Sequence, residues 1–348
     1  MPNPALTSAI DALASRQDLS EQQASEVLSE IMHGEASETQ IAGFLIALRT
    51  KGETVQELAG LARTMRELAA HVPTERHDLL DTAGTGGGRR TFNVSTSAAL
   101  VAAGAGCAVA KHGNRSATSS SGSADLLEAL GARIDLGPEG VAGCIEEAGF
   151  GFMFAPAHHQ ATRFVIPVRR ELAVRTIFNL LGPLTNPAGA TRQLIGVADA
   201  SFMETIAGAL ALLGVERALV VAGEDGLDEV STSAPTRVIE VNGAELTRYT
   251  ITPEEVGIEQ ADVSDPLLGG GSPAENAEVT KMVFAGAQGA HADLVAINAG
   301  AAIYAAGGVD DIAAGVQAAR EAIASGAAGA ALEGYVQASN AHAPEQVS

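Results

Sequence analysis

The sequence contains no tryptophan, and aromatic residues of all kinds make up only 3% of its 348 residues. Its two cysteines, Cys107 and Cys144, are too few for a disulfide framework or a cysteine-built zinc site, which fits a reducing cytosol. No uncharged apolar run is long enough to span a bilayer, and the first residues lack the basic start of a signal peptide. These absences predict a cytoplasmic protein with no membrane partner and a core built from aliphatic side chains.

Basic residues are also scarce, because 21 lysines and arginines stand against 42 aspartates and glutamates, a net charge of −21. Such a chain repels a polyphosphate backbone, and it contains no basic run that could contact one. The composition therefore argues against a nucleic-acid partner.

The length of the chain points to two domains rather than one core. The first part has helical features, because Ser20 with Gln23 and Ser37 with Gln40 have the spacing of capping boxes and apolar residues follow with helical period. From about residue 77, short apolar runs alternate with alanine-rich stretches and glycine turns, which is typical of a parallel sheet with crossover helices.

We therefore expect an α/β fold with a small all-helical domain and a large α/β domain, whose mostly parallel central sheet is flanked by helices. The expected boundaries are residues 1–72 for the helical domain, 73–338 for the α/β domain and 339–348 for a flexible tail. A helical insert near residues 168–190 is expected to pack on the helical domain.

The stretch DTAGTGGGRRTFNVST, residues 81–96, follows an apolar run and precedes an alanine-rich helical pattern. At such a strand-to-helix turn, free backbone N–H groups and the helix dipole favour an anion, and glycine lets the backbone approach phosphate oxygens closely. Asn93, Ser95 and Thr96 add side-chain donors near the start of the helix. The spacing matches neither a Walker loop nor the dinucleotide fingerprint, so the stretch alone leaves both a phosphate cradle and a plain turn open.

A second polar loop, KHGNRSATSSSGSAD (residues 111–125), follows the next apolar run. Loops after neighbouring parallel strands meet at the carboxyl edge of the sheet, where α/β folds bind ligands. Near this edge we expect a group of cations: Lys111, Arg115, Arg163, Arg169 and Arg170. In an acidic chain this group predicts an anionic ligand, and the alternative is that one or two of these cations are solvated or paired with structural carboxylates.

Four collinear motifs then carry a family resemblance. They are DTAGTGG with TFNVST, KHGNR with the serine-rich GSAD loop, PVRRELAVRTIFNLLGPLTNPAG at residues 167–189, and GEDGLDE at residues 223–229. Together they resemble the anthranilate phosphoribosyltransferase family. The resemblance implies the fold shared with pyrimidine nucleoside phosphorylases, usually as a homodimer through the helical domain. It also implies transfer of the phosphoribosyl group of 5-phosphoribosyl-1-pyrophosphate (PRPP) to anthranilate, with Mg²⁺, in tryptophan biosynthesis.

The resemblance also implies which residues bind the substrates and the metal. The expected substrate-binding set is Gly84, Thr85, Gly87, Gly88, Thr91, Asn93, Ser95, Thr96, Lys111, His112, Gly113, Asn114, Arg115, Ser119, Ser123, His159 and Arg169. Mg²⁺ is expected at Ser95, Asp228 and Glu229, because hard oxygen ligands can share the ion with substrate phosphates. From the residues alone, two adjacent acids in GEDGLDE would be interpreted more simply as a solvated turn.

Within that set, the catalytic roles are expected at Asn114, Arg169 and His112. The resemblance assigns Arg169 to the carboxylate of anthranilate, which a planar guanidinium suits, and Asn114 to the orientation of its amine. His112 could accept the amine proton, although water or pyrophosphate could take it instead. Adjacent side chains such as His158 and His159 diverge on most backbones, so we expect them to line the anthranilate channel rather than chelate a metal.

The chain departs from the family pattern in the Gly-rich stretch. The family commonly has Gly-Thr-Gly-Gly-Asp, but here Gly88 stands at the aspartate position, Arg89 and Arg90 follow, and the loop is one residue shorter. The loss of a carboxylate and the gain of two cations beside a polyanionic substrate predict tight PRPP binding with less dependence on additional magnesium. The alternative is that the arginines lie over the loop and pair with acids such as Asp125.

Two rival functions remain open from the sequence. A nucleoside phosphorylase on the same fold would use phosphate and a nucleoside, and KHGNR together with residues 169–187 favours the transferase over it. A catalytically silent relative that binds nucleic acid is opposed by the acidic balance and by the intact pair of Asp228 and Glu229.

Overall fold

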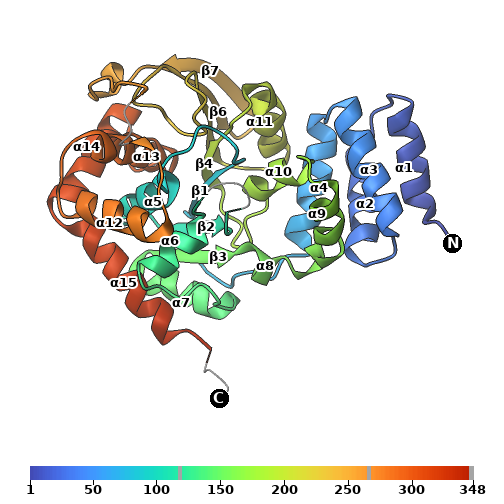
Figure 1. Ribbon diagram of the computed structural model, residues 1–348, viewed down its shortest axis with the longest axis horizontal. Helices are drawn as coiled ribbons and strands as arrows, with labels where there is room; N and C mark the ends of the chain where they lie inside the picture. Colours follow the sequence, from blue (N-terminus) through green and yellow to red (C-terminus); the bar gives the residue numbers. More distant parts are fainter. Residues whose placement is uncertain (117–119, 265–267, 345–348) are drawn as a thin grey trace.

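The computed structural model describes residues 1–116, 120–264 and 268–344, with a helical part on one side of an α/β part (Figure 1). The chain opens with α1 (Pro4–Ala14), α2 (Glu21–Met32), α3 (Glu38–Lys51) and α4 (Val55–Glu67). The predicted capping box of Ser20 and Gln23 is confirmed at the start of α2. At α3 only half of the predicted box forms: Ser37 accepts from the backbone of Gln40, but the Gln40 side chain bonds to the backbone of Asn3 instead.

The sheet has seven strands in the order β3-β2-β1-β4-β5-β6-β7. Their bounds are β1 (Leu80–Gly84), β2 (Val109–Gly113), β3 (Phe150–Phe154), β4 (Arg192–Gly196), β5 (Arg217–Gly223), β6 (Thr236–Asn242) and β7 (Glu245–Ile251). Strands β1 to β5 pair in parallel, and β6 and β7 add antiparallel strands at one edge. The predicted fold class, with a mostly parallel sheet beside a small helical part, is confirmed.

Helices cover both faces of the sheet, because its side chains alternate between two hydrophobic cores. Along β5, Leu219 and Val221 belong to one core, while Ala218, Val220 and Ala222 belong to the other. The remaining helices are α5 (Val94–Gly104), α6 (Ser123–Ala129), α7 (Pro138–Ala148), α8 (Ala155–His158), α9 (Ile166–Leu172), α10 (Phe178–Leu181), α11 (Met203–Leu212), α12 (Pro273–Phe284), α13 (Ala290–Ala305), α14 (Ile312–Ala324) and α15 (Ala327–Ala341).

The second core joins the N-terminal helices to the α/β part. It contains apolar residues of α1–α4, of α9 and α10, of α11 and of one sheet face, so packing continues past residue 72. Phe178 and Leu181 of α10, within the expected insert, are buried in this core. The boundary at residue 72 therefore stays a prediction, and no helix among the described residues is long and apolar enough to cross a membrane.

The C-terminal end differs from the expected tail. Helix α15 continues to Ala341, and Ser339 is fully buried with its hydroxyl accepting from the backbone N–H of Arg133 at 3.1 Å. Residues 339–341 therefore belong to the helix, because a buried polar group with a partner fixes this turn. Residues 345–348 of the expected tail lie outside the described residues.

Candidate active site

Three loops with candidate site residues meet at the carboxyl edge of the sheet. We call them the Gly-rich loop (residues 85–93, after β1), the second loop (residues 114–116 and 120–122, after β2) and the acidic loop (residues 224–235, after β5). Strand β1 pairs in parallel with β2 and β4, and β4 pairs in parallel with β5. The predicted side-by-side placement of the first two loops is confirmed, and the acidic loop joins them at the same edge.

The acidic loop contacts backbone N–H groups of the predicted phosphate cradle. The N–H of Gly86 donates to the carboxylate of Asp228, and the N–H of Ser95, in the first turn of α5, donates to that of Glu229. Asn93 is the N-cap residue of α5, but its side chain accepts no hydrogen bond from the first backbone N–H groups of the helix. Backbone N–H groups of the Gly-rich loop and of the start of α5 therefore face acidic side chains in this structure, at positions where free N–H groups favour an anion.

Burial raises the pKa of both acidic side chains. The pKa of Glu229 rises to about 8, because burial and the charge of Asp228 outweigh the nearby Lys111. Burial also raises the pKa of Asp228, against the hydrogen bonds from its own N–H and that of Gly86. Buried carboxyl groups of this kind gain from a bound cation, so the pair is better suited to a metal ion than the solvated turn considered from sequence.

Lys111 lies beneath this site and is 1% exposed. Its Nζ donates to the backbone carbonyl of Thr82 and to the Thr82 hydroxyl at 3.1 Å, and it lies 3.4 Å from the hydroxyl of Ser95. Burial lowers its pKa, opposed by the charges of Asp81 and Glu229. Lys111 thus balances two buried carboxyl groups here, and its contact with a phosphate stays a prediction.

Polar side chains of the second loop bond within the loop and to helix α6. The guanidinium of Arg115 pairs with Asp125 at 2.8 Å and Glu128 at 2.5 Å, so this cation has the structural partners that the alternative interpretation allowed. The Asn114 side chain is exposed, and its oxygen accepts from the N–H of Arg115 at 2.7 Å. Ser119 lies outside the described residues.

The side chain of Asn93 connects the start of α5 to the second loop and to α12. Its side chain donates to the carbonyl of Ser121 and accepts from the Ser121 hydroxyl at 2.8 Å and from Asn276 of α12 at 2.9 Å. The hydroxyl of Thr96 is buried with no hydrogen-bond partner among the described residues. Ser123 begins α6 and packs against Gly113, where an added Cβ would lie 3.1 Å from the Ser123 side chain.

The three histidines make separate bonds to backbone carbonyls. Nδ1 of His112 bonds to Gly182 at 3.1 Å, Nε2 of His159 to Thr185 at 3.0 Å, and Nδ1 of His158 to Ala70 at 3.2 Å. The rings of His112 and His159 stack edge to face, 5.0 Å apart. Burial lowers their pKa values to about 3 and about 4, so both rings are neutral, and Nε2 of His112 is buried with no partner among the described residues.

Arg169 stands apart from the other predicted cations. It lies in α9, is half-buried, and its guanidinium sits 5.3 Å from the centre of the Phe178 ring. It makes no ion pair with any described carboxylate, and burial alone lowers its pKa. A half-buried guanidinium next to an aromatic ring, without an anionic partner, suits a planar aromatic carboxylate. Arg163 also lies over an aromatic ring, that of Phe164, but both Arg163 and Arg170 are exposed.

Two residues at this edge escaped the sequence prediction. Asp81 is fully buried and accepts from the N–H of His112 at 3.1 Å and from Asn186 at 2.8 Å, so it fixes the end of β2, just before the second loop. Arg175 donates to the carbonyls of Gly86 at 2.9 Å and Thr85 at 3.4 Å. Both residues stand within the quoted motifs, but nothing in the motif spacing indicates these partners.

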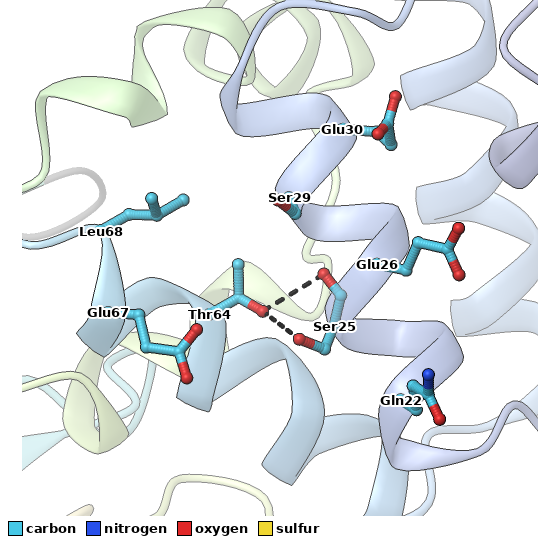
Figure 2. Close-up of a pocket in the computed structure, with 8 residues that line it drawn as sticks. All are labelled: Gln22, Ser25, Glu26, Ser29, Glu30, Thr64, Glu67 and Leu68. Atoms are coloured by element: carbon cyan, nitrogen blue, oxygen red, sulfur yellow. Dashed lines mark hydrogen bonds between the residues drawn. The ribbon is translucent and has the colours of Figure 1, made fainter.

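A groove of about 330 Å³ lies elsewhere, between α2 and α4 (Figure 2). Its lining residues are Gln22, Ser25, Glu26, Ser29, Glu30, Thr64, Glu67 and Leu68. The hydroxyls of Ser25 and Thr64 bond to each other at 2.7 Å across its floor. This acidic lining does not suit an anionic ligand, so the sheet edge remains the candidate site.

Comparisons with known proteins identify the family of the chain. The helical bundle domain of a glycosyl transferase family matches residues 7–69, and the a/b domain of that family matches residues 76–329. The anthranilate phosphoribosyltransferase of Rubrobacter xylanophilus is 53% identical over 336 residues, which cover 96% of this chain and 97% of that protein.

Solved structures agree as well. The anthranilate phosphoribosyltransferase from Thermus thermophilus is similar with a TM-score of 0.90 and 48% identity, covering 95% of this chain and 99% of that one. The Saccharomyces cerevisiae enzyme in complex with PRPP and Mg is similar with a TM-score of 0.87 and 28% identity, covering 97% and 98%. The chain therefore belongs to the anthranilate phosphoribosyltransferase family, as its motifs predicted.

Proposed function

We propose that this chain transfers the phosphoribosyl group of PRPP to the amine of anthranilate, giving N-(5-phosphoribosyl)anthranilate and pyrophosphate in tryptophan biosynthesis. One observation carries the proposal: backbone donors of the Gly-rich loop and of α5 contact the carboxylates of Asp228 and Glu229. A magnesium pyrophosphate group needs both kinds of partner in one place. The name shared by relatives about half identical over nearly the whole chain supports the same reaction.

The residues present fit Mg²⁺. Asp228 and Glu229 supply hard carboxylate oxygens. The backbone N–H of Ser95 bonds to Glu229, and the Ser95 hydroxyl lies 3.4 Å from Nζ of Lys111. Mg²⁺ in proteins is commonly held by one or two carboxylates together with substrate phosphates, so a larger protein cage is not required. When bound, the ion would supply charge neutralisation for the departing pyrophosphate.

PRPP binding is assigned to the donors around the cradle. The N–H groups of Gly86 and Ser95 can pass from the carboxylates to phosphate oxygens. The hydroxyl of Thr96, which has no partner among the described residues, lies in the same turn of α5 as Ser95. Arg175 fixes the carbonyls of the Gly-rich loop so that its N–H groups keep their direction. The binding energy is thus used to hold the ribose C1 carbon in place.

Anthranilate binding is assigned to Arg169, His112 and Asn114. The guanidinium of Arg169, which pairs with no described carboxylate, binds the carboxylate of anthranilate. The neutral His112 ring donates from Nδ1 to Gly182, so its free Nε2 accepts an N–H of the amine and orients it. His159 keeps the His112 ring in position by edge-to-face contact.

The reaction then requires positioning and charge stabilisation rather than a covalent nucleophile. The amine nitrogen forms a bond to C1 while the C1–O bond breaks, and the electron pair leaves with pyrophosphate. The amine gives up one proton, for which pyrophosphate, water and His112 are the available acceptors. Because the pKa of His112 is lowered to about 3, its main role is orientation of the amine.

The test is to incubate the protein with anthranilate, PRPP and Mg²⁺ and to follow the loss of anthranilate fluorescence together with the release of pyrophosphate. Both signals should change together and should require all three components. No change with the wild-type protein would refute the proposal. Phosphorolysis of a pyrimidine nucleoside in the same preparation would favour the rival phosphorylase, and a gel shift with single-stranded DNA would favour the nucleic-acid-binding rival.

Assembly and location stay predictions. We propose a homodimer through the helical part, where Ile46 of α3 is exposed beside an apolar groove lined by Leu13, Gly43 and Ala47. Sedimentation velocity tests this, and Ile46→Glu should shift a dimer toward monomer. We also propose a cytoplasmic location, which fractionation of the source cells tests.

A further inference from the structure

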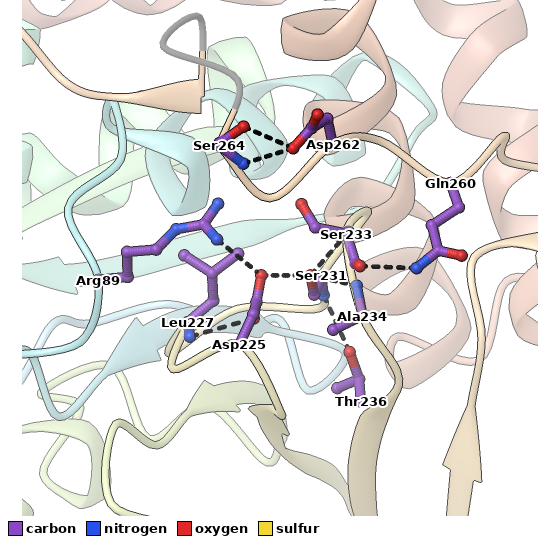
Figure 3. Close-up of polar contacts among 10 residues, drawn as sticks. All are labelled: Arg89, Asp225, Leu227, Ser231, Ser233, Ala234, Thr236, Gln260, Asp262 and Ser264. Carbon is purple, nitrogen blue, oxygen red and sulfur yellow. Dashed lines mark hydrogen bonds and ion pairs between the residues drawn. The ribbon is translucent and has the colours of Figure 1, made fainter.

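The Gly-rich loop is bound to the acidic loop by an ion pair between Arg89 and Asp225, an acid that the sequence analysis did not name as a partner. The guanidinium Nη1 of Arg89 lies 3.0 Å from Oδ2 of Asp225 (Figure 3). The backbone N–H of Arg89 also donates to the carbonyl of Gly226 at 2.8 Å. The Asp225 side chain is 3% exposed and that of Arg89 is 25% exposed. This pair is therefore shielded from solvent more than the exposed ion pairs on the rest of the surface.

Asp225 in turn organises the acidic loop. Its carboxylate accepts from the hydroxyl of Ser231 at 2.9 Å and from the N–H of Leu227 at 3.4 Å. The Ser231 hydroxyl also accepts from the N–H of Ser233 at 2.9 Å, so the bonds continue along the loop (Figure 3). Asp228 and Glu229 lie between residues 225 and 231, inside the segment that these bonds close.

Gly88 brings the two loops into contact. A Cβ added at Gly88 would lie 2.5 Å from Oδ1 of Asp228, 2.9 Å from its backbone nitrogen and 2.9 Å from the carbonyl oxygen of Gly226. The Asp228 loop thus fills the space that a side chain at position 88 would need. This packing is the physical reason why an aspartate at position 88 does not fit here.

The charge of Arg89 is therefore already neutralised by Asp225. The sequence left two options for Arg89, a cation available to the substrate or a partner of an acid such as Asp125. The structure supports the second option with Asp225 as the acid, whereas Asp125 itself pairs with Arg115. Arg90 is exposed and makes no ion pair within the described residues.

We propose that Arg89 is a positioning residue, whose ion pair with Asp225 fixes the acidic loop against the Gly-rich loop and so places Asp228 and Glu229 for Mg²⁺ in the PRPP complex. The proposal rests on the proposed function, because it assigns a partner to that same site. This proposal replaces the earlier expectation of reduced magnesium dependence. The ion pair joins the shortened Gly-rich loop to the acidic loop and so fixes the metal-binding acids that the acidic loop carries.

The test compares Arg89→Ala, Arg89→Lys and Asp225→Asn with wild type, and Arg248→Ala serves as a control that removes an arginine–carboxylate pair on β7, away from the site. Isothermal titration calorimetry measures PRPP binding with and without Mg²⁺, and steady-state kinetics measures the half-saturating Mg²⁺ concentration and the KM for anthranilate. Thermal melting reports on folding of each variant.

Arg89→Ala and Asp225→Asn should each weaken PRPP binding in Mg²⁺ by about tenfold, as expected for loss of a charged hydrogen bond, and should raise the half-saturating Mg²⁺ concentration. The KM for anthranilate should stay within about twofold, and Arg89→Lys should recover part of the loss. Arg248→Ala should bind PRPP as wild type does.

Asp225→Asn separates positioning from direct contact. If Arg89 contacted PRPP itself, Asp225→Asn would free its charge, and PRPP binding would stay equal or become tighter, which would overturn the proposal. Equal binding by wild type and Arg89→Ala would also overturn it. Failure of wild type to bind PRPP at all would instead refute the proposed function, so the two failures are distinguishable.

Discussion

Replacement of Gly88 by alanine tests the contact between the two loops most directly. The added methyl carbon would lie 2.5 Å and 2.9 Å from atoms of Asp228 and 2.9 Å from the carbonyl of Gly226, where ordinary contact begins at 3.4 Å. Two of these three neighbours are backbone atoms, so a side-chain rotation cannot relieve the overlap. The loops must separate by about 0.5 Å or more, at a cost of about 1–3 kcal/mol.

The separation has two measurable consequences. The melting temperature should fall by at least about 2 °C, since about 1 kcal/mol corresponds to a few degrees for a chain of this size. The dissociation constant for PRPP in Mg²⁺ should rise by about tenfold, because the bond from Arg89 N–H to Gly226 and the ion pair with Asp225 span the same contact.

Differential scanning fluorimetry and titration calorimetry give these two values on one preparation. Gly329→Ala in α15 is the matched control, because an added Cβ there meets nothing within 4 Å and alanine favours a helix by about 0.5–1 kcal/mol over glycine. Its melting temperature should be equal or higher. A Gly88→Ala protein with the melting temperature and PRPP affinity of wild type would refute the packing argument.

Three further changes probe the rest of the site. Arg169→Ala should raise the anthranilate KM about tenfold or more and leave PRPP binding unchanged in calorimetry, because its guanidinium lacks any described carboxylate partner; the reverse pattern would contradict the assignment. Asp228→Asn combined with Glu229→Gln should weaken Mg²⁺-dependent PRPP binding more than anthranilate binding, and equal Mg²⁺ titrations would contradict the metal assignment. His159→Gln should flatten the pH dependence of stability between about pH 6.5 and 4. Because the pKa of His159 is lowered in the folded protein, the unfolded chain takes up the proton first as the pH falls. The contribution of neutral His159 to stability is therefore present above that range and is lost as the pH falls, by at most about 1.4 kcal/mol per pH unit for this proton. Urea unfolding at several pH values measures this, and the same pH dependence of the unfolding free energy in wild type and variant would contradict it.

The elements of the fold followed from local patterns. The glycine stretch between an apolar run and an alanine-rich run predicted β1, a turn and α5, and the structure has α5 over Val94–Gly104. Parallel strands bury both faces, so their short apolar runs are readable without alignment. The sequence missed where α15 ends, because the burial of Ser339 depends on Arg133 in a distant segment.

Side-chain partners are harder to predict from the sequence than elements. Lys111, Asn93 and Arg115 were expected as ligand contacts, which stays a prediction, and the structure adds protein partners that the sequence did not indicate: Lys111 is buried against Thr82, and Arg115 is paired on its own loop and helix. A cation in a motif can face a ligand or a nearby carboxylate, and both arrangements satisfy the same charge count. Which of the two arrangements forms depends on the direction of the strand that carries the cation and on the position of the helix that carries the acid.

The pair of Arg89 and Asp225 shows why this limit is physical. The two residues are 136 positions apart in the sequence. They come together because only β4 lies between β1 and β5 in the sheet, so the loops that follow β1 and β5 are close in space. An interpretation of the Gly-rich loop alone counts a lost aspartate and two added arginines, and it predicts a stronger field on the substrate. Once the strand order is known, one of those charges is neutralised within the protein. The presence of Gly88 and Arg89 in place of the family's aspartate then affects the position of the metal-binding carboxylates. Its effect should therefore be greater on magnesium-dependent PRPP binding than on anthranilate binding.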